Sequence, residues 1–237
     1  MTRTPIWTSI TEALEAEITS GQRRPGDKLP TEAELASRFG VNRHTVRRAL
    51  ADLAARGRVH ARRGSGVFVQ EGRPVDYPIG RRTRLSRNLA AAGREAGRHI
   101  LSAETRRASL AEAEALVLTP GSAVHVVEGI SLADGVPLAL FRSVLPAERF
   151  PDMLATLREE TSVTVALRRH GVEDYTRADT RLTAKRATAT MALHLGLREG
   201  DPILRTVSVN VDGDGRPVEY GHTWFAGDRV TLTVTPD

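Results

Sequence analysis

The stretch 41–50, VNRHTVRRAL, crowds basic side chains into the first turns of a predicted helix. On a helical wheel the basic residues fan over one side: Arg43, His44, Arg47 and Arg48. The opposite side is apolar: Val46, Ala49, Leu50 and Leu53. The fork of an Arg side chain bonds guanine O6 and N7 together, and it also pairs with phosphate oxygens. By itself, the stretch fits a nucleic-acid contact and an ordinary solvated helix face equally well.

The excess of positive charge lies in the first third of the chain. The 237 residues include 34 Lys or Arg and 29 Asp or Glu, a net charge of +5. Residues 1–73 hold 13 basic and 8 acidic residues, which accounts for the whole excess, whereas residues 74–237 hold 21 of each. This asymmetry predicts a polyanionic partner for the N-terminal part alone.

Capping signals predict three helices in this basic part. The first helix is expected over 6–20. Thr31 and Glu34 have the spacing of a capping box, so a second helix begins there and ends at Gly40. Asn42 is a good N-cap for the third helix. A single residue separates the second and third helices, which indicates a helix-turn-helix.

A basic hairpin follows the third helix. The segment 58–69, RVHARRGSGVFV, alternates around a Gly-Ser-Gly tip. Three helices and a hairpin make a winged helix-turn-helix. Arg62 and Arg63 at the hairpin tip and Lys28 before the second helix extend the basic surface, and this favours DNA over a solvated face.

After a turn-rich linker at 71–78, the pattern changes to long strands with helices between them. Hairpins are predicted to turn at Asp134-Gly135 and at 212–215, and helices are predicted near 87–93, 147–160, 162–170 and 184–195. The expected domains are therefore a winged helix-turn-helix at 1–70, the linker, and an antiparallel α+β domain at 79–237.

Several residues of the second domain suit a small anionic ligand. Ser86 is a candidate N-cap, with Arg84 before it and Asn88 in the first turn, although an ordinary capping role explains Ser86 equally well. Arg142 shares a strand face with apolar residues, and Glu219 shares one with Gly221 and Thr223. Arg142 and Glu219 pairing with each other is the alternative. The predicted effector-binding set is Arg84, Ser86, Asn88, Arg142, Arg181, Glu219 and Tyr220.

Other chemistries have little support. The chain has no Cys, its seven His form no HxxxH pair, and no catalytic residue, metal or cofactor is predicted. Ser65 lacks the frame of a nucleophile elbow, and DGDG at 212–215 fits a hairpin turn better than a calcium loop. No apolar run approaches the length of a membrane span and the N-terminus is not a signal peptide, so a cytoplasmic protein is expected.

The segment 25–69 resembles the winged helix of GntR-family bacterial transcription regulators over nearly its whole length. The resemblance implies that Asn42, Arg43, His44, Thr45 and Arg47 face DNA and that Gly64 to Gly66 form the wing tip. Many members carry Arg where this chain has Ala33, which puts one usual contact in doubt. The full predicted DNA-binding set is Lys28, Thr31, Asn42, Arg43, His44, Thr45, Arg47, Arg48, Arg62, Arg63, Gly64 and Gly66.

Residues 78–235 resemble, more loosely, the UTRA effector domain of the HutC-type branch, a fold shared with chorismate lyase. Two segments, VDYPIGRRTRLSRNL at 75–89 and TRLTAKRATATMALHLGL at 180–197, are similar to phosphonate-metabolism regulators. UTRA members often carry Arg where this chain has Val127, so the ligand-site charges differ in part from the family pattern.

The sequence therefore predicts a ligand-responsive repressor of phosphonate or phosphate uptake or metabolism genes, acting as a homodimer on palindromic half-sites. One alternative is the same architecture responding to a sugar phosphate or another small acid. A chorismate-lyase-type enzyme is the other alternative, and the basic winged helix on the same chain argues against it.

Overall fold

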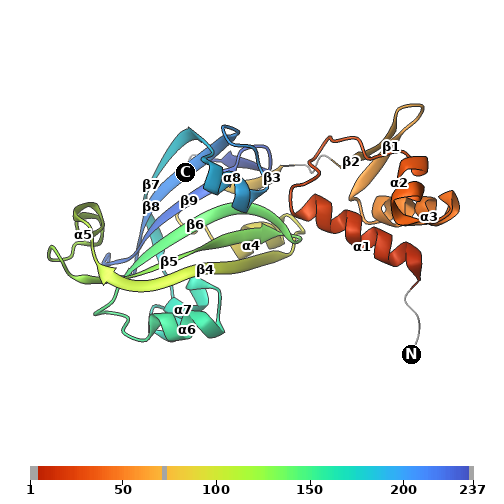
Figure 1. Cartoon of the computed structure of the whole chain (residues 1–237). Helices are drawn as coiled ribbons and strands as arrows, with labels where there is room; N and C mark the ends of the chain where they lie inside the picture. Colours follow the sequence, from red (N-terminus) through yellow and green to blue (C-terminus); the bar gives the residue numbers. More distant parts are fainter. Residues whose placement is uncertain (1–4, 71–73, 235–237) are drawn as a thin grey trace. The chain divides into compact units, whose positions relative to one another are not determined.

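The structure, a computed structural model, describes residues 5–70 and 74–234 (Figure 1). The chain divides into two compact units, 1–73 and 74–237. Within the described ranges, no helix is long and apolar enough to cross a membrane.

The first unit is the predicted winged helix-turn-helix. Its elements are α1 (Ile6–Thr19), α2 (Glu32–Phe39), α3 (Arg43–Ala55), β1 (Val59–Arg62) and β2 (Gly66–Val69). Thr31 and Glu34 form the predicted capping box, and Gly40 ends α2 in the left-handed conformation with φ 64°. The Asn42 side chain accepts a hydrogen bond from the Thr45 backbone N–H at 2.9 Å and so begins α3.

The apolar side of α3 forms the centre of this unit's core. Val46, Ala49 and Leu53 are fully buried against Leu14 of α1 and Leu35 of α2. Val59 and Val69 of the wing close the same cluster. Because this face is anchored, the opposite face of α3 and its basic side chains turn to solvent.

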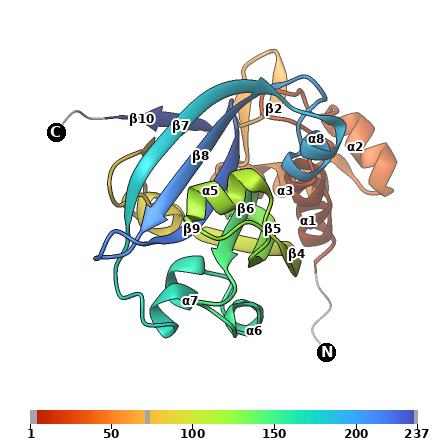
Figure 2. The same cartoon turned by 90° about the vertical axis from the view of Figure 1, so that its left-hand side faces the viewer.

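The second unit is built on one antiparallel sheet, seen from the side in Figure 1 and from its end in Figure 2. Its strands are ordered β4-β5-β6-β9-β8-β7. Their bounds are β4 (Ala96–Arg107), β5 (Ala123–Ala133), β6 (Val136–Pro146), β7 (Thr176–Arg186), β8 (Pro202–Val211) and β9 (Pro217–Ala226). The predicted turn between β5 and β6 is confirmed, with Asp134 and Gly135 at φ 48° and 78°. The α+β class of the unit is confirmed as well.

Helices cover both faces of this sheet. They are α4 (Leu85–Ala91), α5 (Leu110–Leu116), α6 (Met153–Glu159), α7 (Val163–Arg169) and α8 (Ala189–Leu195). Phe141 of β6 packs with α6 and α7, whereas its neighbour Leu140 packs with α8. Since successive side chains of a strand point to opposite faces, we name these the α7 face and the α8 face. Helix α5 covers another part of the α8 face, through Leu116 against Val144.

Three sequence-based boundaries need correction. Residues 75–78, placed in the linker, form β3 (Val75–Pro78), which pairs in parallel with β10 (Val230–Thr233). The helix expected from 184 begins only at Ala189, because β7 continues to Arg186 and Thr188 is the N-cap. The helix expected from 147 begins at Met153, after a turn that contains Pro151.

Gly129 of β5 allows close packing on the α7 face. A Cβ atom there would overlap the His99 carbonyl oxygen and lie 2.7 Å from the Phe141 ring. We expect Gly129→Ala to lower the free energy of unfolding by about 2 kcal/mol or more, because a rigid backbone atom and a buried ring must both move. Urea unfolding measures the change. The control is Gly213→Ala, where the added methyl meets nothing within 4 Å; equal stability of the two variants would contradict the prediction.

Candidate DNA-binding surface and effector cavity

The start of α3 presents basic side chains to solvent. Arg43 and His44 are exposed and make no side-chain hydrogen bond or ion pair with the described residues. Thr45 is bonded to the N-cap, since its hydroxyl donates to Asn42 Oδ1 at 2.9 Å. Thr31 is likewise engaged, in the capping box with Glu34. All five residues remain predicted DNA contacts, and Asn42 and Thr31 also start helices.

Arg47 and Arg48 have partners within the unit. Arg47 binds Glu32 through two bonds, Nε to Oε1 at 3.1 Å and Nη2 to Oε2 at 2.8 Å. The guanidinium of Arg48 lies 4.6 Å from the centre of the Trp7 ring of α1, a cation–π contact. Arg48 is thus held toward α1, which its position on the wheel did not predict.

The wing carries a second group of cations. The Arg62 guanidinium stacks 4.8 Å from the Phe68 ring centre, and Arg63 is exposed. Lys28 lies against the wing, because a Cβ at Gly66 would be 2.8 Å from Lys28 Cε. Gly64 and Gly66 have φ values of 75° and 115°, which glycine adopts without strain. The wing tip therefore needs its glycines, and Lys28 lies beside the hairpin that carries Arg62 and Arg63.

The second unit contains a cavity of about 80 Å³ on the α7 face. The residues that line it come from several parts of the unit: Tyr77, Thr83 and Arg84 before and at the start of α4; Arg98 of β4; Thr164 of α7; Tyr175 and Arg177 at the start of β7; and Phe141, Ser143, Ser208, Asn210, Glu219 and Gly221 of the central strands. This volume suits a ligand of several heavy atoms.

Positive charge exceeds negative charge in this cavity. Arg84, Arg98 and Arg177 line it together with one carboxylate, Glu219. Arg84 donates to Asp174 at 2.6 Å and lies 4.7 Å from the centre of the Tyr175 ring. The Nε groups of Arg84 and Arg177 are buried and have no hydrogen-bond partner among the described residues. An unsatisfied buried donor is costly, so the cavity favours a ligand that brings acceptor oxygens.

Burial and charge shift several pKa values around the cavity. Burial raises the pKa of Tyr77 to about 12, against the opposing effect of the Arg177 and Arg98 charges. Burial also raises the pKa of Tyr175 and lowers that of Arg98, whose guanidinium lies 4.3 Å from the centre of the Phe141 ring. The two tyrosines thus remain neutral hydrogen-bonding groups at neutral pH.

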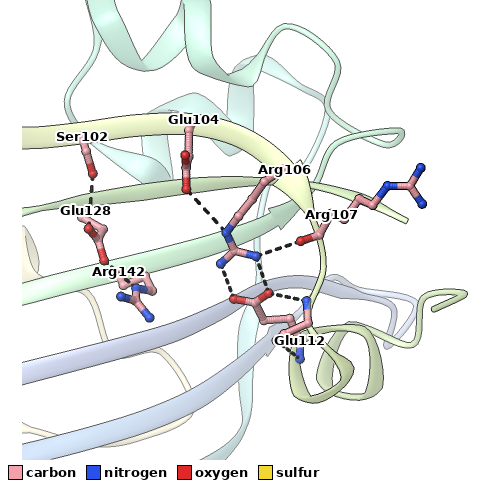
Figure 3. Close-up of polar contacts among 8 residues, drawn as sticks. Ser102, Glu104, Arg106, Arg107, Glu112, Glu128 and Arg142 are labelled. Carbon is pink, nitrogen blue, oxygen red and sulfur yellow. Dashed lines mark hydrogen bonds and ion pairs between the residues drawn. The ribbon is translucent and has the colours of Figure 1, made fainter. Parts of the chain in front are cut away.

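Arg142 and Glu219 do not meet, contrary to both sequence-based expectations for them. Glu219 lies in the cavity on the α7 face and accepts hydrogen bonds from Ser143 and Asn210. Arg142 is the neighbour of Phe141 and Ser143 on β6 and is itself among the residues around the cavity. Its side chain, however, lies on the α8 face, where Nε donates to Glu128 at 2.6 Å (Figure 3). The sheet separates the two side chains, so one small ligand does not contact both.

Four other predicted effector residues lie outside the cavity. Ser86 is not the N-cap of α4, because the helix begins at Leu85 with Arg84 as its cap. Asn88 is buried and donates to the Pro78 carbonyl oxygen at 3.2 Å, a structural role. Arg181 is exposed and pairs with Asp179, and Tyr220 packs on the α8 face against Val144. Of the predicted set, Arg84 and Glu219 are the two whose side chains contribute to the cavity.

Three charged residues of these surfaces were missed from the sequence: Glu32, Arg98 and Arg177. Arg98 lies on β4, which no pattern predicted as a strand. Arg177 lies four residues before Arg181, but a bulge between Arg177 and Asp179 puts the two cations on opposite faces. Glu32 left a usable signal, as an acid one residue after a helix cap and close in sequence to a basic helix.

A basic winged helix joined to an α+β unit is a build found in transcription regulators. Residues 7–69 match the family model described as "Bacterial regulatory proteins, gntR family", and residues 91–231 match the UTRA domain. The chain belongs to the GntR family of bacterial transcription regulators and carries a UTRA domain.

The chain is similar to its relatives over nearly the whole length of both. An HTH-type transcriptional regulator of Rhizobium meliloti (strain 1021) is 41% identical, covering 97% of this chain and 94% of its own. The "Probable transcriptional regulator PhnF" of Escherichia coli (strain K12) is 35% identical, covering 95% and 92%. The crystal structure of PhnF from Mycobacterium smegmatis is similar with a TM-score of 0.65 and 29% identity, covering 96% and 99%. These relatives are regulators, and the chain is a regulator rather than an enzyme.

Substitution of Arg47 on α3 tests whether this side chain contacts a base or a backbone phosphate. If it reads guanine, Arg47→Ala should weaken binding to a specific DNA site by about ten- to a hundredfold and change binding to random DNA much less. Fluorescence anisotropy with both DNAs at two salt concentrations measures this. The control is Arg56→Ala, at the far end of the same helix. Equal losses on both DNAs would make Arg47 a phosphate contact, and no loss would remove it from the surface.

Proposed function

We propose that the chain is a ligand-responsive repressor whose DNA affinity changes when a small phosphonate or phosphate anion binds in the cavity of its UTRA domain. The observation that carries this proposal is the pair of buried, unsatisfied Nε groups of Arg84 and Arg177 in a cavity with surplus positive charge. The regulated genes would be those of phosphonate or phosphate uptake or metabolism.

The chemistry of the cavity supports a ligand with a tetrahedral oxyanion. Arg binds such groups through short, charge-assisted hydrogen bonds, which are stronger than neutral ones. Burial strengthens these bonds, because water competes less inside the cavity. The neutral hydroxyl of Tyr175, 2.7 Å from the Thr164 hydroxyl, adds a further polar group beside Arg84.

Glu219 places a negative charge in the cavity, opposite in sign to the charges of the arginines. The residue is 8% exposed, and its carboxylate accepts hydrogen bonds from Ser143 and Asn210. A carboxylate repels an anionic group and favours a ligand donor such as an ammonium or a hydroxyl. An aminoalkyl phosphonate satisfies both polarities. A sugar phosphate supplies hydroxyls instead, and the experiment distinguishes the two.

The sequence resemblance to phosphonate-metabolism regulators supports this choice of ligand. The segment 75–89, which carries that resemblance, includes Tyr77, Thr83 and Arg84 of the cavity wall. The resemblance and the cation-lined site therefore fall on the same residues. This agreement favours the phosphonate class over the wider family of small acids.

Arg177→Ala tests the site. We expect it to weaken binding of aminoethylphosphonate to the full chain by about tenfold or more, because a charge-assisted bond to the anion is lost. Isothermal titration calorimetry with aminoethylphosphonate, inorganic phosphate and a hexose phosphate measures the affinities. DNA binding without ligand should be unchanged.

Arg181→Ala is the matched control, since it removes the same charge from the same strand on the exposed, opposite face. Equal losses in both variants would mean a general charge effect and contradict the cavity site. Tighter binding of the hexose phosphate than of both other anions would replace the phosphonate class with a sugar phosphate.

The regulator is proposed to act as a homodimer on two half-sites related by a two-fold axis, because one recognition helix contacts too few base pairs for a specific site. Analytical ultracentrifugation should give twice the 25.8 kDa chain mass, and footprinting should show two symmetric protected segments. A monomer that protects a single asymmetric segment would contradict this.

A further inference from the structure

Glu32 is an acidic side chain within a basic surface. It lies in the first turn of α2, and its carboxylate binds both Nε and Nη2 of Arg47 on α3. The Arg47 side chain is 64% exposed and that of Glu32 is 35% exposed. The pair therefore lies on the surface, beside the solvent-facing start of α3.

The pair uses one edge of the guanidinium and leaves the other open. The two carboxylate oxygens occupy the edge formed by Nε and Nη2. The end of the fork keeps the N–H groups of Nη1 and the second N–H of Nη2. Two parallel donors at the end of the fork are what bidentate contact with guanine O6 and N7 requires. A side chain that is already oriented also loses less rotamer freedom when it binds.

The charge of Glu32 has a second effect, on contacts with the DNA backbone. Its hydrogen bonds with Arg47, and the nearby charges of Arg47, Arg43 and His44, lower the pKa of its carboxyl group. Glu32 is therefore ionised at neutral pH. An ionised carboxylate on this surface repels phosphates and offsets part of the cation field that drives sequence-independent binding.

We infer that Glu32 is a specificity-determining residue, which orients the Arg47 fork toward a base and weakens binding to the phosphate backbone. This role rests on the proposed contact of Arg47 with DNA. Glu32 is thus a positioning residue that acts through Arg47. An ordinary exposed ion pair would contribute little and would leave specificity unchanged.

The test compares Glu32→Gln with the parent full-length chain on two DNA probes. One is a fragment that the parent selects from a random library, and the other is a scrambled fragment of the same length and composition. We expect Glu32→Gln to bind the selected fragment about threefold to tenfold more weakly, and the scrambled fragment as tightly as the parent or more tightly. Thermal unfolding verifies that the variant is folded.

Two further variants make the result specific. Glu15→Gln removes the same charge from an acid that pairs with Arg56 and Arg58, and it should leave the ratio of the two affinities unchanged. In an Arg47→Ala background, Glu32→Gln should no longer alter the ratio, because the residue it orients is gone. This second comparison measures the coupling between the two side chains directly.

The outcomes separate the inference from the proposed function. If Glu32→Gln bound both DNAs more tightly by the same factor, Glu32 would only repel phosphates. An unchanged ratio of the two affinities would mean that Glu32 has no role in specificity. Either result overturns the inference. A parent chain that selects no sequence would instead refute the proposed function. A persistent effect of Glu32→Gln without Arg47 would show that Glu32 does not act through Arg47, and would also overturn the inference.

Discussion

The antiparallel pairing of β6 with β9 determines which side chains of the second unit meet. Ser143 lies opposite Gly221 and Arg142 lies opposite His222. Because strand side chains alternate, this register puts Ser143 and Glu219 on the α7 face and sends Arg142 to the α8 face. A shift by one residue would exchange the two faces and dismantle the cavity. The charge pattern of the cavity therefore depends on the strand register as much as on the residue types.

The two units use the same residue type under opposite conditions. In the winged helix, Arg43 and Arg63 are exposed, so their charges act through a screened, longer-range field that favours a polyanion. In the UTRA domain, Arg84 and Arg177 hold buried Nε groups, where under the proposed function an oxyanion would gain strong local bonds. The net charge of residues 74–237 is zero, because the acidic residues of this domain balance its basic ones. The charge count therefore gave no sign of the arginines in the cavity.

Local signals made the first unit predictable, and non-local pairing limited the prediction of the second. The capping box at Thr31, the cap at Asn42 and the left-handed Gly40 are set by neighbours within four residues, and the structure confirms them. In the sheet, the face partners of Glu219 were also correct, since alternation is local. Whether Arg142 and Glu219 lie on the same face depended on the register of β6 with β9. The face of Arg181 depended on a bulge after Arg177, which turns its side chain away from the face of Arg177. Arg98 escaped notice because β4 is an edge strand whose alternation of polar and apolar residues is weak.

Linking the two units requires that the ligand distinguish between arrangements of the protein. A ligand with equal affinity for two arrangements shifts neither, however tightly it binds, and a change from 1:99 to 99:1 needs about a 10⁴-fold difference in affinity. Tyr77 of the cavity wall lies on β3, the first strand after the boundary between the units. Under the proposed function, a ligand contact that shifts β3 would act on the first strand of the second unit. Under the proposed function, the anion adds a contact at Arg84 Nε while Asp174 holds Nη2 at 2.6 Å, and that added contact is a difference from which such a preference can arise.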